Sequence, residues 1–313
     1  MNANDKIYNM VTERVVAKIE DAIRAAENGE TVIAPWHRPW FQAGMPMNLV
    51  SKKAYRGMNV FLLSMIGYAS PYFLTFNQVR KLGGSVKKGE KGMPVVFWKW
   101  IEVSKDKDGK KLEEPKKIPF LRYYTVFNVE QCEGIEDKIP SMPTRTFNPI
   151  EDGERIIANM PNRPNMENGE ARAFYRPTTD TVNMPRKELF DGDAEYYSTC
   201  FHELVHSTGH ASRLNRKEVT DGNFFGSHDY SVEELVAEMG AIFLCNEIGV
   251  ATTFDNSLAY LKGWLAKIKN DTKMLITASG RAQKAADYIL GRKIGETKPE
   301  TTETSGNDTE DDD

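Results

Sequence analysis

The sequence predicts an α+β protein with two domains, and three observations support this fold class. The chain has 313 residues, which is too long for a single domain with one ordinary hydrophobic core and fits two domains. Apolar residues recur at helical spacing in several long segments, whereas residues 93–103 and 118–129 are rich in β-branched and aromatic side chains. Charge is also unevenly distributed along the chain. The expected parts are an N-terminal α+β domain over 1–140, a linker over 141–147, a mainly helical domain with a small sheet over 148–295, and a disordered acidic tail over 296–313.

The first domain is expected to open with an amphipathic helix. Its apolar face is formed by Ile7, Met10, Val11, Val15, Ile19 and Ile23. A second helix fits residues 54–69. A short helix follows, and Gly83 and Gly84 end it before a basic turn. Residues 93–103 and 118–129 then form two strands, and the charged residues 104–117 between them are expected to be a mobile hairpin loop.

The second domain is expected to open with a helix over residues 149–160. Residues 171–185 fit a strand, a turn and a second strand. A histidine-containing helix, a glycine-rich loop over 221–230 and a helix over 231–249 come next, and two further helical segments reach about Gly295. The tail has eight acids and one lysine, Lys298, a composition typical of disorder.

The composition excludes a membrane protein and a disulfide scaffold. The longest apolar stretch, residues 60–74, is interrupted by Ser64, Gly67 and Pro71 and is too short to cross a bilayer. The N-terminus lacks the features of a signal peptide. The cysteines are three and far apart, so we expect a cytoplasmic protein with reduced thiols and no membrane partner.

Residues 202–206 read HELVH, the HExxH pattern of zinc peptidases. On a helix, His202 and His206 lie on one face, roughly 6 Å apart, and both imidazoles can reach one metal ion. Glu203 is displaced by one position, so it can contact a metal-bound water and act as general base. The pattern therefore predicts one Zn²⁺ per chain, with Mn²⁺ or another divalent ion as the alternative.

A catalytic zinc site usually has a third protein ligand, and the segment EELVAE, residues 233–238, offers one. We expect Glu234 to be this ligand and Glu238 to orient a histidine N–H from behind the site. The alternative is that Ser231 and Glu234 form a capping box, which would leave Glu238 as the ligand.

Three further residues are candidates in this region. His210 is an alternative third ligand, but Gly209 is expected to end the helix before it. His228 and Tyr230 could donate to an oxyanion, although an ordinary loop role explains them as well. The hairpin over 171–185 could bind a substrate as an added strand, or be purely structural.

The N-terminal half combines positive charge with aromatic rings. Residues 31–100 contain ten lysines and arginines against one acid, Glu90, and four of the five tryptophans. This mixture is typical of proteins that bind single-stranded nucleic acid, where cations meet phosphates and rings stack on bases. Taken singly, each tryptophan fits a core position as well. The candidate DNA-binding residues are Trp36, Arg38, Trp40, Lys52, Lys53, Tyr55, Arg56, Lys87, Lys88, Lys91, Trp98 and Lys99.

The chain resembles the ArdC-type antirestriction proteins of conjugative plasmids and other mobile elements. The resemblance covers nearly all of residues 1–295. In the first half it rests on PWHRPW, YRGMNVFLL, VKKGEKG, VFWK and YTVFNVEQCEG. In the second half it rests on HELVHSTGH, FGSHDYSVEELVAEMGAIFL and AQKAADYIL.

The resemblance implies a single-stranded DNA-binding domain followed by a gluzincin-like metallopeptidase domain. It also implies protection of incoming DNA from host restriction, His202 and His206 as ligands, Glu203 as base and a glutamate of EELVAE as third ligand. Two functions follow. One is a DNA-tethered zinc peptidase that acts on an unidentified protein, which could belong to the host restriction machinery. The other is a protein that only coats DNA and holds a structural zinc.

Overall fold

The computed structural model describes residues 3–29, 45–105, 111–140, 149–220, 228–250 and 258–293. The N-terminal half contains α1 (Ala3–Glu27), β1 (Met47–Asn48), α2 (Met58–Ser64), β2 (Tyr72–Thr75), α3 (Phe76–Lys81), β3 (Ser85–Val86), β4 (Met93–Lys105), β5 (Lys111–Asn128) and β6 (Cys132–Glu133). The C-terminal half contains α4 (Pro149–Asn159), β7 (Asn165–Glu167), β8 (Phe174–Arg176), β9 (Thr181–Asn183), α5 (Asp193–Ser207), α6 (Lys217–Thr220), α7 (His228–Ile248), α8 (Leu258–Asn270) and α9 (Met274–Ile289). Both halves combine helices with small sheets, which confirms the α+β class.

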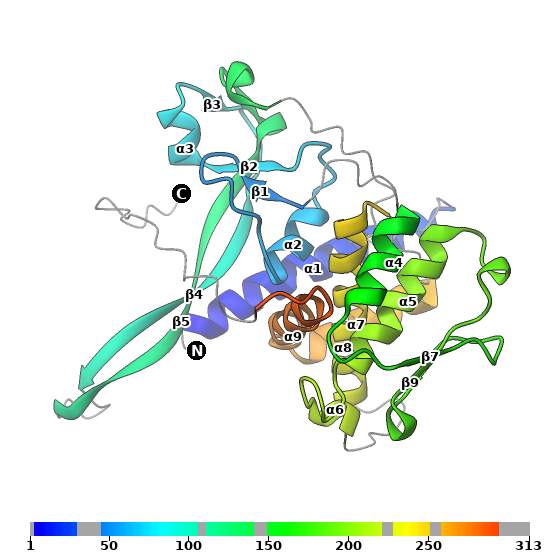
Figure 1. Ribbon diagram of the computed structural model, residues 1–313. Coiled ribbons are helices and arrows are strands. Elements are labelled where there is room, and N and C mark those ends of the chain that lie inside the picture. The colour runs from blue at the N-terminus through cyan, green and yellow to red at the C-terminus, as the bar shows by residue number, and fades with distance from the viewer. Residues whose placement is uncertain are drawn as a thin grey trace.

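The longest strands form a hairpin that extends away from the helices (Figure 1). β4 and β5 pair from Met93 opposite Val126 to Lys105 opposite Lys111, and the sheet order is β1-β2-β5-β4. The expectation of a loop over 104–117 is wrong at both ends, because β4 reaches Lys105 and β5 begins at Lys111, and residues 106–110 lie outside the described residues. In this register Glu102 lies opposite Lys117.

The first helix joins the two halves of the molecule. The predicted apolar face of α1 is buried, with Val11, Val15 and Ile19 fully inaccessible to solvent. α1 contacts β5 on one side and α8 on the other. Ion pairs from Glu20 to Lys269 (2.6 Å) and from Glu27 to Lys262 (2.8 Å) support the contact with α8. The apolar face predicted from sequence therefore packs against both halves.

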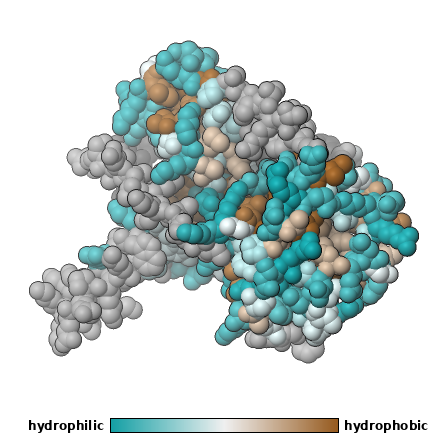
Figure 2. All heavy atoms as spheres, viewed as in Figure 1, coloured by the Kyte–Doolittle hydropathy of each residue, from teal (hydrophilic) through white to brown (hydrophobic). Residues whose placement is uncertain are grey.

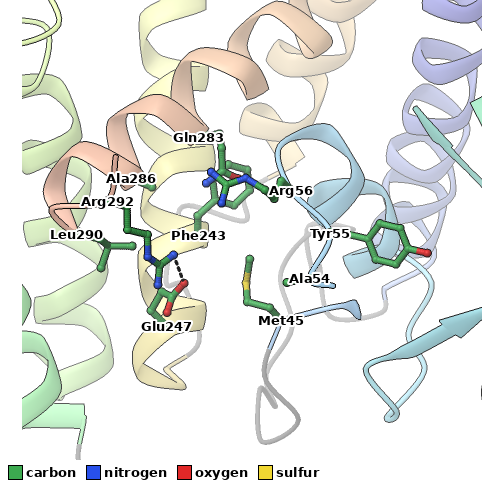
Figure 3. Close-up of a pocket in the computed structure, with 10 residues that line it drawn as sticks. All are labelled: Met45, Ala54, Tyr55, Arg56, Phe243, Glu247, Gln283, Ala286, Leu290 and Arg292. Atoms are coloured by element: carbon green, nitrogen blue, oxygen red, sulfur yellow. Dashed lines mark hydrogen bonds and ion pairs between the residues drawn. The ribbon is translucent and has the colours of Figure 1, made fainter. Parts of the chain in front are cut away.

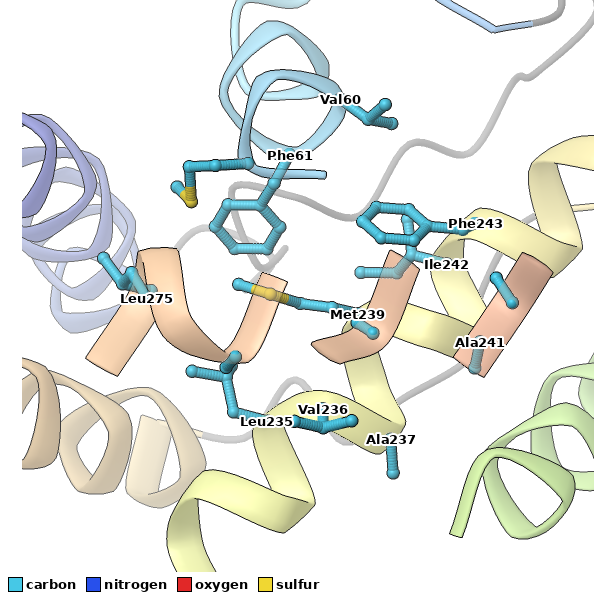
Figure 4. Close-up of a cluster of buried hydrophobic side chains, with 14 of the residues drawn as sticks. Val60, Phe61, Leu235, Val236, Ala237, Met239, Ala241, Ile242, Phe243 and Leu275 are labelled. Atoms are coloured by element: carbon cyan, nitrogen blue, oxygen red, sulfur yellow. The ribbon is translucent and has the colours of Figure 1, made fainter. Parts of the chain in front are cut away.

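α2 also docks on the C-terminal half. It is shorter than the helix expected over 54–69, and it begins after Gly57, which has a φ of 54°. Figure 4 shows Phe61 of α2 beside Met239 of α7 and Leu275 of α9, in a single hydrophobic cluster that contains residues of both halves. At the rim of this interface Gln283 accepts a hydrogen bond from the Gly57 N–H (2.9 Å).

A small pocket lies where this interface reaches the surface (Figure 3). Glu247 and Arg292 form an ion pair on one side of it, at 2.8 Å. Arg56 enters from the N-terminal half and pairs with the buried Asp287 of α9. Arg56 was a candidate DNA contact, and its guanidinium is instead engaged in holding the halves together.

The outer part of the N-terminal half, here called the head, has a core of its own. Its buried residues are Leu49, Tyr72, Leu74, Val79, Val129, Cys132 and Ile135. Thr75 and Gln78 form a capping box at the start of α3, and Gly83, with a φ of 90°, follows its end as expected. Hydrophobic side chains reach the surface of the head near α3 and β3 (Figure 2), and Val50 and Phe76 are among the exposed ones.

In the C-terminal half, α5, α7 and α9 pack together and bury the apolar residues between them. A three-stranded sheet with the order β7-β9-β8 lies beside α5. The predicted strand, turn and strand over 171–185 correspond to β8 and β9, while the parallel strand β7 was not predicted. Among the described residues, none of the helices combines the length and the apolar character that a bilayer crossing needs.

Candidate functional site

The histidines of the HELVH segment occupy the last turns of α5. Asp193 and Glu195 lie in its first turn, where negative charge favours a helix. The apolar face of the helix buries Phe201, Leu204 and other residues against the core, which leaves His202 and His206 partly exposed on another face. Their Nε2 atoms are 3.1 Å apart. Both nitrogens therefore point at one location.

α7 brings a carboxylate to the same location. Glu234 places Oε2 3.6 Å from His202 Nε2 and Oε1 3.5 Å from His206 Nε2. The donor atoms of these three residues all lie within 4.8 Å of one another. Two imidazole nitrogens and a carboxylate oxygen are the ligand set of many catalytic zinc sites and are also suited to Mn²⁺. The side chains therefore fit a divalent ion chemically.

The approach of α7 depends on a glycine. A Cβ atom on Gly240 would lie 2.7 Å from Val205 Cγ2, so only glycine allows α5 and α7 this close. The structure identifies Gly240 as the residue against α5.

His206 is held from behind by a second carboxylate that the sequence analysis did not assign. Glu233 Oε1 lies 3.1 Å from His206 Nδ1. Burial alone would lower the pKa of His206, but this hydrogen bond and the charges of Glu233, Glu234 and Glu203 raise its pKa to about 9. Because a carboxylate only accepts hydrogen bonds, His206 Nδ1 must be the donor, which leaves Nε2 to face a metal.

Glu233 is itself bound by a buried arginine. Arg216 donates from Nε to Oε2 (2.9 Å) and from Nη2 to Oε1 (2.6 Å). Burial would raise the pKa of Glu233, but the hydrogen bonds from His206 and Arg216 hold it below its usual value. The adjacent acids Glu233 and Glu234 could have indicated two different roles, because neighbouring positions of a helix point to different faces.

Glu238 lies near enough to His202 for their charges to interact, and its role in orienting a histidine N–H stays a prediction. It is buried and accepts a hydrogen bond from the Tyr260 hydroxyl of α8 (2.5 Å). Burial raises the pKa of Glu238 to about 7. Glu233 is the carboxylate that contacts His206 from behind. The capping-box alternative also fails, because α7 begins at His228 and Ser231 therefore lies inside the helix.

His210 lies beyond the end of α5. Its Nδ1 is 2.8 Å from Ser212 Oγ. Within the described part of the chain, the metal-type cluster consists of His202, His206 and Glu234 and does not include His210 or Glu238. Gly209 follows the helix as expected but for another reason: it does not adopt a positive φ, and a Cβ atom there would lie 2.4 Å from Val219 Cγ2.

Three other predicted features of this half have different outcomes. Glu203 is partly buried on α5, and its charge reaches His206. His228 and Tyr230 lie in the first turn of α7, but their side chains fall outside the described residues. The hairpin of β8 and β9 is fixed to the end of α5 by the buried Arg213, which donates to the Ser207 carbonyl (2.7 Å) and pairs with Asp180.

Apart from Arg56, which pairs with Asp287, the candidate DNA-binding residues fall into three groups. Trp36, Arg38 and Trp40 lie outside the described residues. Tyr55 is only 4% exposed, so its ring packs in the core and cannot meet a base. The exposed candidates are Lys52, Lys53, Lys87, Lys88, Lys91, Trp98 and Lys99.

An exposed ring that the sequence analysis missed lies next to Trp98. Tyr123 of β5 is 51% exposed and Trp98 of β4 is 42% exposed. Trp98 lies opposite Leu121, and Tyr123 lies opposite Val96, so the two rings share one face of the hairpin. Alternation along the strand places Tyr123 on the same face as the fully buried Leu121, so the pattern alone could not have identified Tyr123 as exposed.

Comparison with known protein families gives two matches that together span most of the chain. A family model for the N-terminal domain of the anti-restriction factor ArdC matches residues 5–127. A model of zincin-like metallopeptidases matches residues 151–281. The site described above lies in the second region.

Similar solved structures include the antirestriction protein ArdC of plasmid R388 in two forms. The metal-free form is 36% identical, with a TM-score of 0.68, over 90% of this chain and 96% of that protein. The Mn(II)-bound form is also 36% identical, with a TM-score of 0.67, over 91% and 97% of the two chains. A divalent metal is therefore known in a protein of this fold.

Curated relatives show the same region in proteins of different length. The uncharacterized protein y4eC of Sinorhizobium fredii (strain NBRC 101917 / NGR234) is 32% identical over 90% of this chain and 91% of its own length. Two proteins of Escherichia coli named DNA primase TraC are 33% and 34% identical over 90% and 82% of this chain. The chain spans only 28% and 18% of those two relatives.

Proposed function

Because the chain belongs to the ArdC-type antirestriction family, we propose that it binds single-stranded DNA and has a metallopeptidase centre that uses a divalent ion, zinc in the first instance. Its role is to protect the incoming DNA of a mobile element from host restriction. Its protein substrate is a protein encountered at the DNA, with the host restriction machinery as the first candidate.

The peptidase proposal is carried by one observation, the convergence of His202, His206 and Glu234 within 4.8 Å. We assign these three residues as the metal ligands. Glu233 supports the assignment, because its contact with His206 Nδ1 directs Nε2 toward the other two donors. The side chains remain partly exposed, which allows a water molecule and a substrate carbonyl to reach the ion.

The chemistry follows from the positions of the side chains. A bound divalent ion would polarise the scissile carbonyl and make a water molecule more acidic. Glu203, adjacent to His202 on α5, accepts the proton of the attacking water and passes it to the leaving amine. β8, an outer strand of the small sheet beside α5, offers backbone groups along which an extended substrate could pair.

The DNA-binding proposal rests on the charge and the exposed rings of the N-terminal half. Lys87, Lys88 and Lys91 are exposed on the turn between β3 and β4. Trp98 and Tyr123 present rings on the hairpin that leaves the same half of the molecule. Phosphates would meet the lysines while bases stack on the rings, a mode that does not depend on base sequence.

The replacement Glu203→Gln tests the peptidase directly. We expect cleavage of an unfolded protein substrate to fall by about 10²–10⁴-fold, the usual contribution of a general base, with metal content unchanged. Glu195→Gln, two turns earlier on the same helix, is the matched control and should cleave normally. Wild-type cleavage by Glu203→Gln would overturn the mechanism.

The same variant separates this function from simple DNA coating. If Glu203→Gln protects single-stranded DNA from a restriction nuclease as well as the wild type does, protection depends on DNA binding and not on cleavage. The exposed lysines and rings favour this second candidate as the function of the N-terminal half by itself.

A further inference from the structure

Arg216 is a buried cation at the junction of α5 and α7. It is 7% exposed and lies just before α6. It donates to Thr208 Oγ1 (2.6 Å) and to the Val205 carbonyl (2.8 Å), both at the C-terminal end of α5. The remaining hydrogen bonds reach both oxygens of Glu233 on α7. One guanidinium therefore connects the helix that holds the histidines to the helix that holds the carboxylates.

The partner of Arg216 is the carboxylate that contacts His206. Glu233 is 4% exposed, and a buried carboxylate without a counter-charge is strongly unfavourable. The planar guanidinium binds both oxygens, so it fixes the rotation of the carboxylate and also balances its negative charge. Oε1 is then held 3.1 Å from His206 Nδ1. A lysine at this position could supply the positive charge, but it could not make the bidentate hydrogen bonds to both carboxylate oxygens.

We propose that Arg216 is a positioning residue of the metal centre: it holds Glu233 in place, and Glu233 in turn orients His206 so that Nε2 faces His202 and Glu234. The inference rests on the proposed function in that it assigns His206 as a metal ligand. It extends that function to a residue outside the HExxH segment and outside EELVAE. The proposed effect of Arg216 on the metal centre passes through Glu233, while its bonds to Thr208 and to the Val205 carbonyl hold the end of α5.

The surroundings of Arg216 permit an unusually direct test. Arg216 lines a pocket of about 490 Å³ between the turn at residues 214–218 and α9, together with Lys217, Glu218, Arg281 and others. The side chain of Arg216 is buried and borders this pocket. In Arg216→Ala, we expect a guanidinium ion from solution to reach the space left by the missing group through this pocket.

The experiment measures binding of Mn²⁺ and of Zn²⁺ to the full chain by titration calorimetry. We expect Arg216→Ala to weaken metal binding by about 10- to 100-fold, the usual effect of removing the residue that supports a ligand. The affinity of Arg216→Lys should lie between those of the wild type and Arg216→Ala. Guanidinium at millimolar concentration, far below denaturing levels, should restore affinity to Arg216→Ala. The same concentration of sodium chloride should not.

Arg213→Ala is the matched control. Arg213 is also a buried arginine at the end of α5, but it pairs with Asp180 and bonds the Ser207 carbonyl instead of contacting Glu233. It should lower the melting temperature and leave metal affinity near that of the wild type. An equal loss of affinity in Arg213→Ala and Arg216→Ala would overturn the proposal, because general loosening of the helix end would then explain both.

Two further outcomes are decisive. A folded Arg216→Ala that binds metal as tightly as the wild type contradicts the inference and leaves the proposed function intact, whereas a wild-type chain that binds neither metal defeats both. If Arg216→Ala does not fold, Glu233→Gln replaces it, since an amide cannot accept from the guanidinium at both atoms. Undiminished metal affinity in Glu233→Gln would then reject the proposal.

Discussion

Gly240 of α7 lies directly against Val205 of α5, at a separation that leaves no room for a methyl group. A Cβ atom on Gly240 would be 2.7 Å from Val205 Cγ2 and 3.0 Å from Cγ1. Val205 is fully buried and lies one residue before His206, while Gly240 lies less than two turns beyond Glu234. The contact therefore sets the distance between the proposed ligands on the two helices.

Gly240→Ala should consequently affect both stability and the metal centre. The added methyl group forces α5 and α7 apart, at a cost of about 1–3 kcal/mol in the free energy of unfolding, and weakens metal binding. Gly263→Ala is the matched control, because it lies within α8 and its Cβ would meet nothing within 4 Å. Thermal unfolding should show that variant to be unchanged or stabilised by up to about 1 kcal/mol. A destabilised Gly263→Ala beside a normal Gly240→Ala would contradict the packing argument.

The identity of the third ligand can be tested with two conservative replacements. Glu234→Gln removes the carboxylate that faces both Nε2 atoms, so we expect a loss of metal affinity of at least about 100-fold. Glu238→Gln should bind metal nearly as well as the wild type, since an amide can keep a hydrogen bond to Tyr260. Calorimetric titration of both variants decides the matter, and the reverse order of effects would make Glu238 the ligand.

Proton competition at His206 predicts how metal binding depends on pH. Burial, the largest single effect, would lower the pKa of His206, but the hydrogen bond to Glu233 and the negative charges around the ring together raise it to about 9 without metal. Below that value the ring carries a proton on each nitrogen, and the proton on Nε2 must leave before a metal can bind. Affinity should therefore rise by up to about tenfold per pH unit toward pH 9 and then level off. Affinity that does not vary between neutral and mildly alkaline pH would exclude Nε2 of His206 as a ligand.

Sequence reasoning located the histidines and the carboxylate helix because their spacing alone restricts the geometry. The i, i+4 relation of His202 and His206 fixes a shared face wherever the helix lies. Assigning roles to Glu233 and Glu238 requires knowing which side of α7 meets α5, and Gly240 decides this through packing. Arg216 is ten residues beyond His206 and has no motif, so only the folded turn brings it to Glu233.

In the N-terminal half, too, local spacing predicts an element, whereas contacts between distant residues decide its surroundings. The period of the apolar residues predicted the buried face of α1, but not that α8 would cover part of it. Tyr55 was grouped with lysines and Arg56 because they are neighbours in sequence. Its ring is buried and packs edge-to-face on Phe73, and Arg56 turns to Asp287. Exposure depends on such distant contacts, which local composition does not contain.

The two exposed rings of the hairpin predict a contribution to DNA binding. Trp98 and Tyr123 are diagonal neighbours on one face, about 7–8 Å apart at such positions, which is roughly twice the spacing of stacked bases. Trp98→Ala and Tyr123→Ala should each weaken binding of single-stranded DNA by about 1–3 kcal/mol, measured by fluorescence anisotropy. Tyr55→Phe, which alters a buried ring, should bind normally. Normal binding by the double variant Trp98→Ala, Tyr123→Ala would exclude this face as a stacking surface.

The basic turn of the head is expected to contribute to DNA affinity through its charge, independently of base sequence. Lys87, Lys88 and Lys91 are exposed, while Glu90, the acid among them, accepts hydrogen bonds from Gln131 (2.8 Å) and from the Tyr68 hydroxyl (3.2 Å). The turn thus presents a net positive charge that any phosphate chain can meet. Replacing the three lysines by glutamine should weaken binding to single strands of every sequence and reduce the slope of log affinity against log salt by up to about 2.

Salt dependence separates these lysines from the rings. The Trp98 and Tyr123 variants lose stacking and no charge, so they should weaken binding while the salt slope stays that of the wild type. The lysine variant should lose both affinity and slope, because each neutralised phosphate releases a counterion. An unchanged slope after all three replacements would show that the DNA backbone does not contact this turn, and the phosphate contacts would then have to lie elsewhere in the N-terminal half.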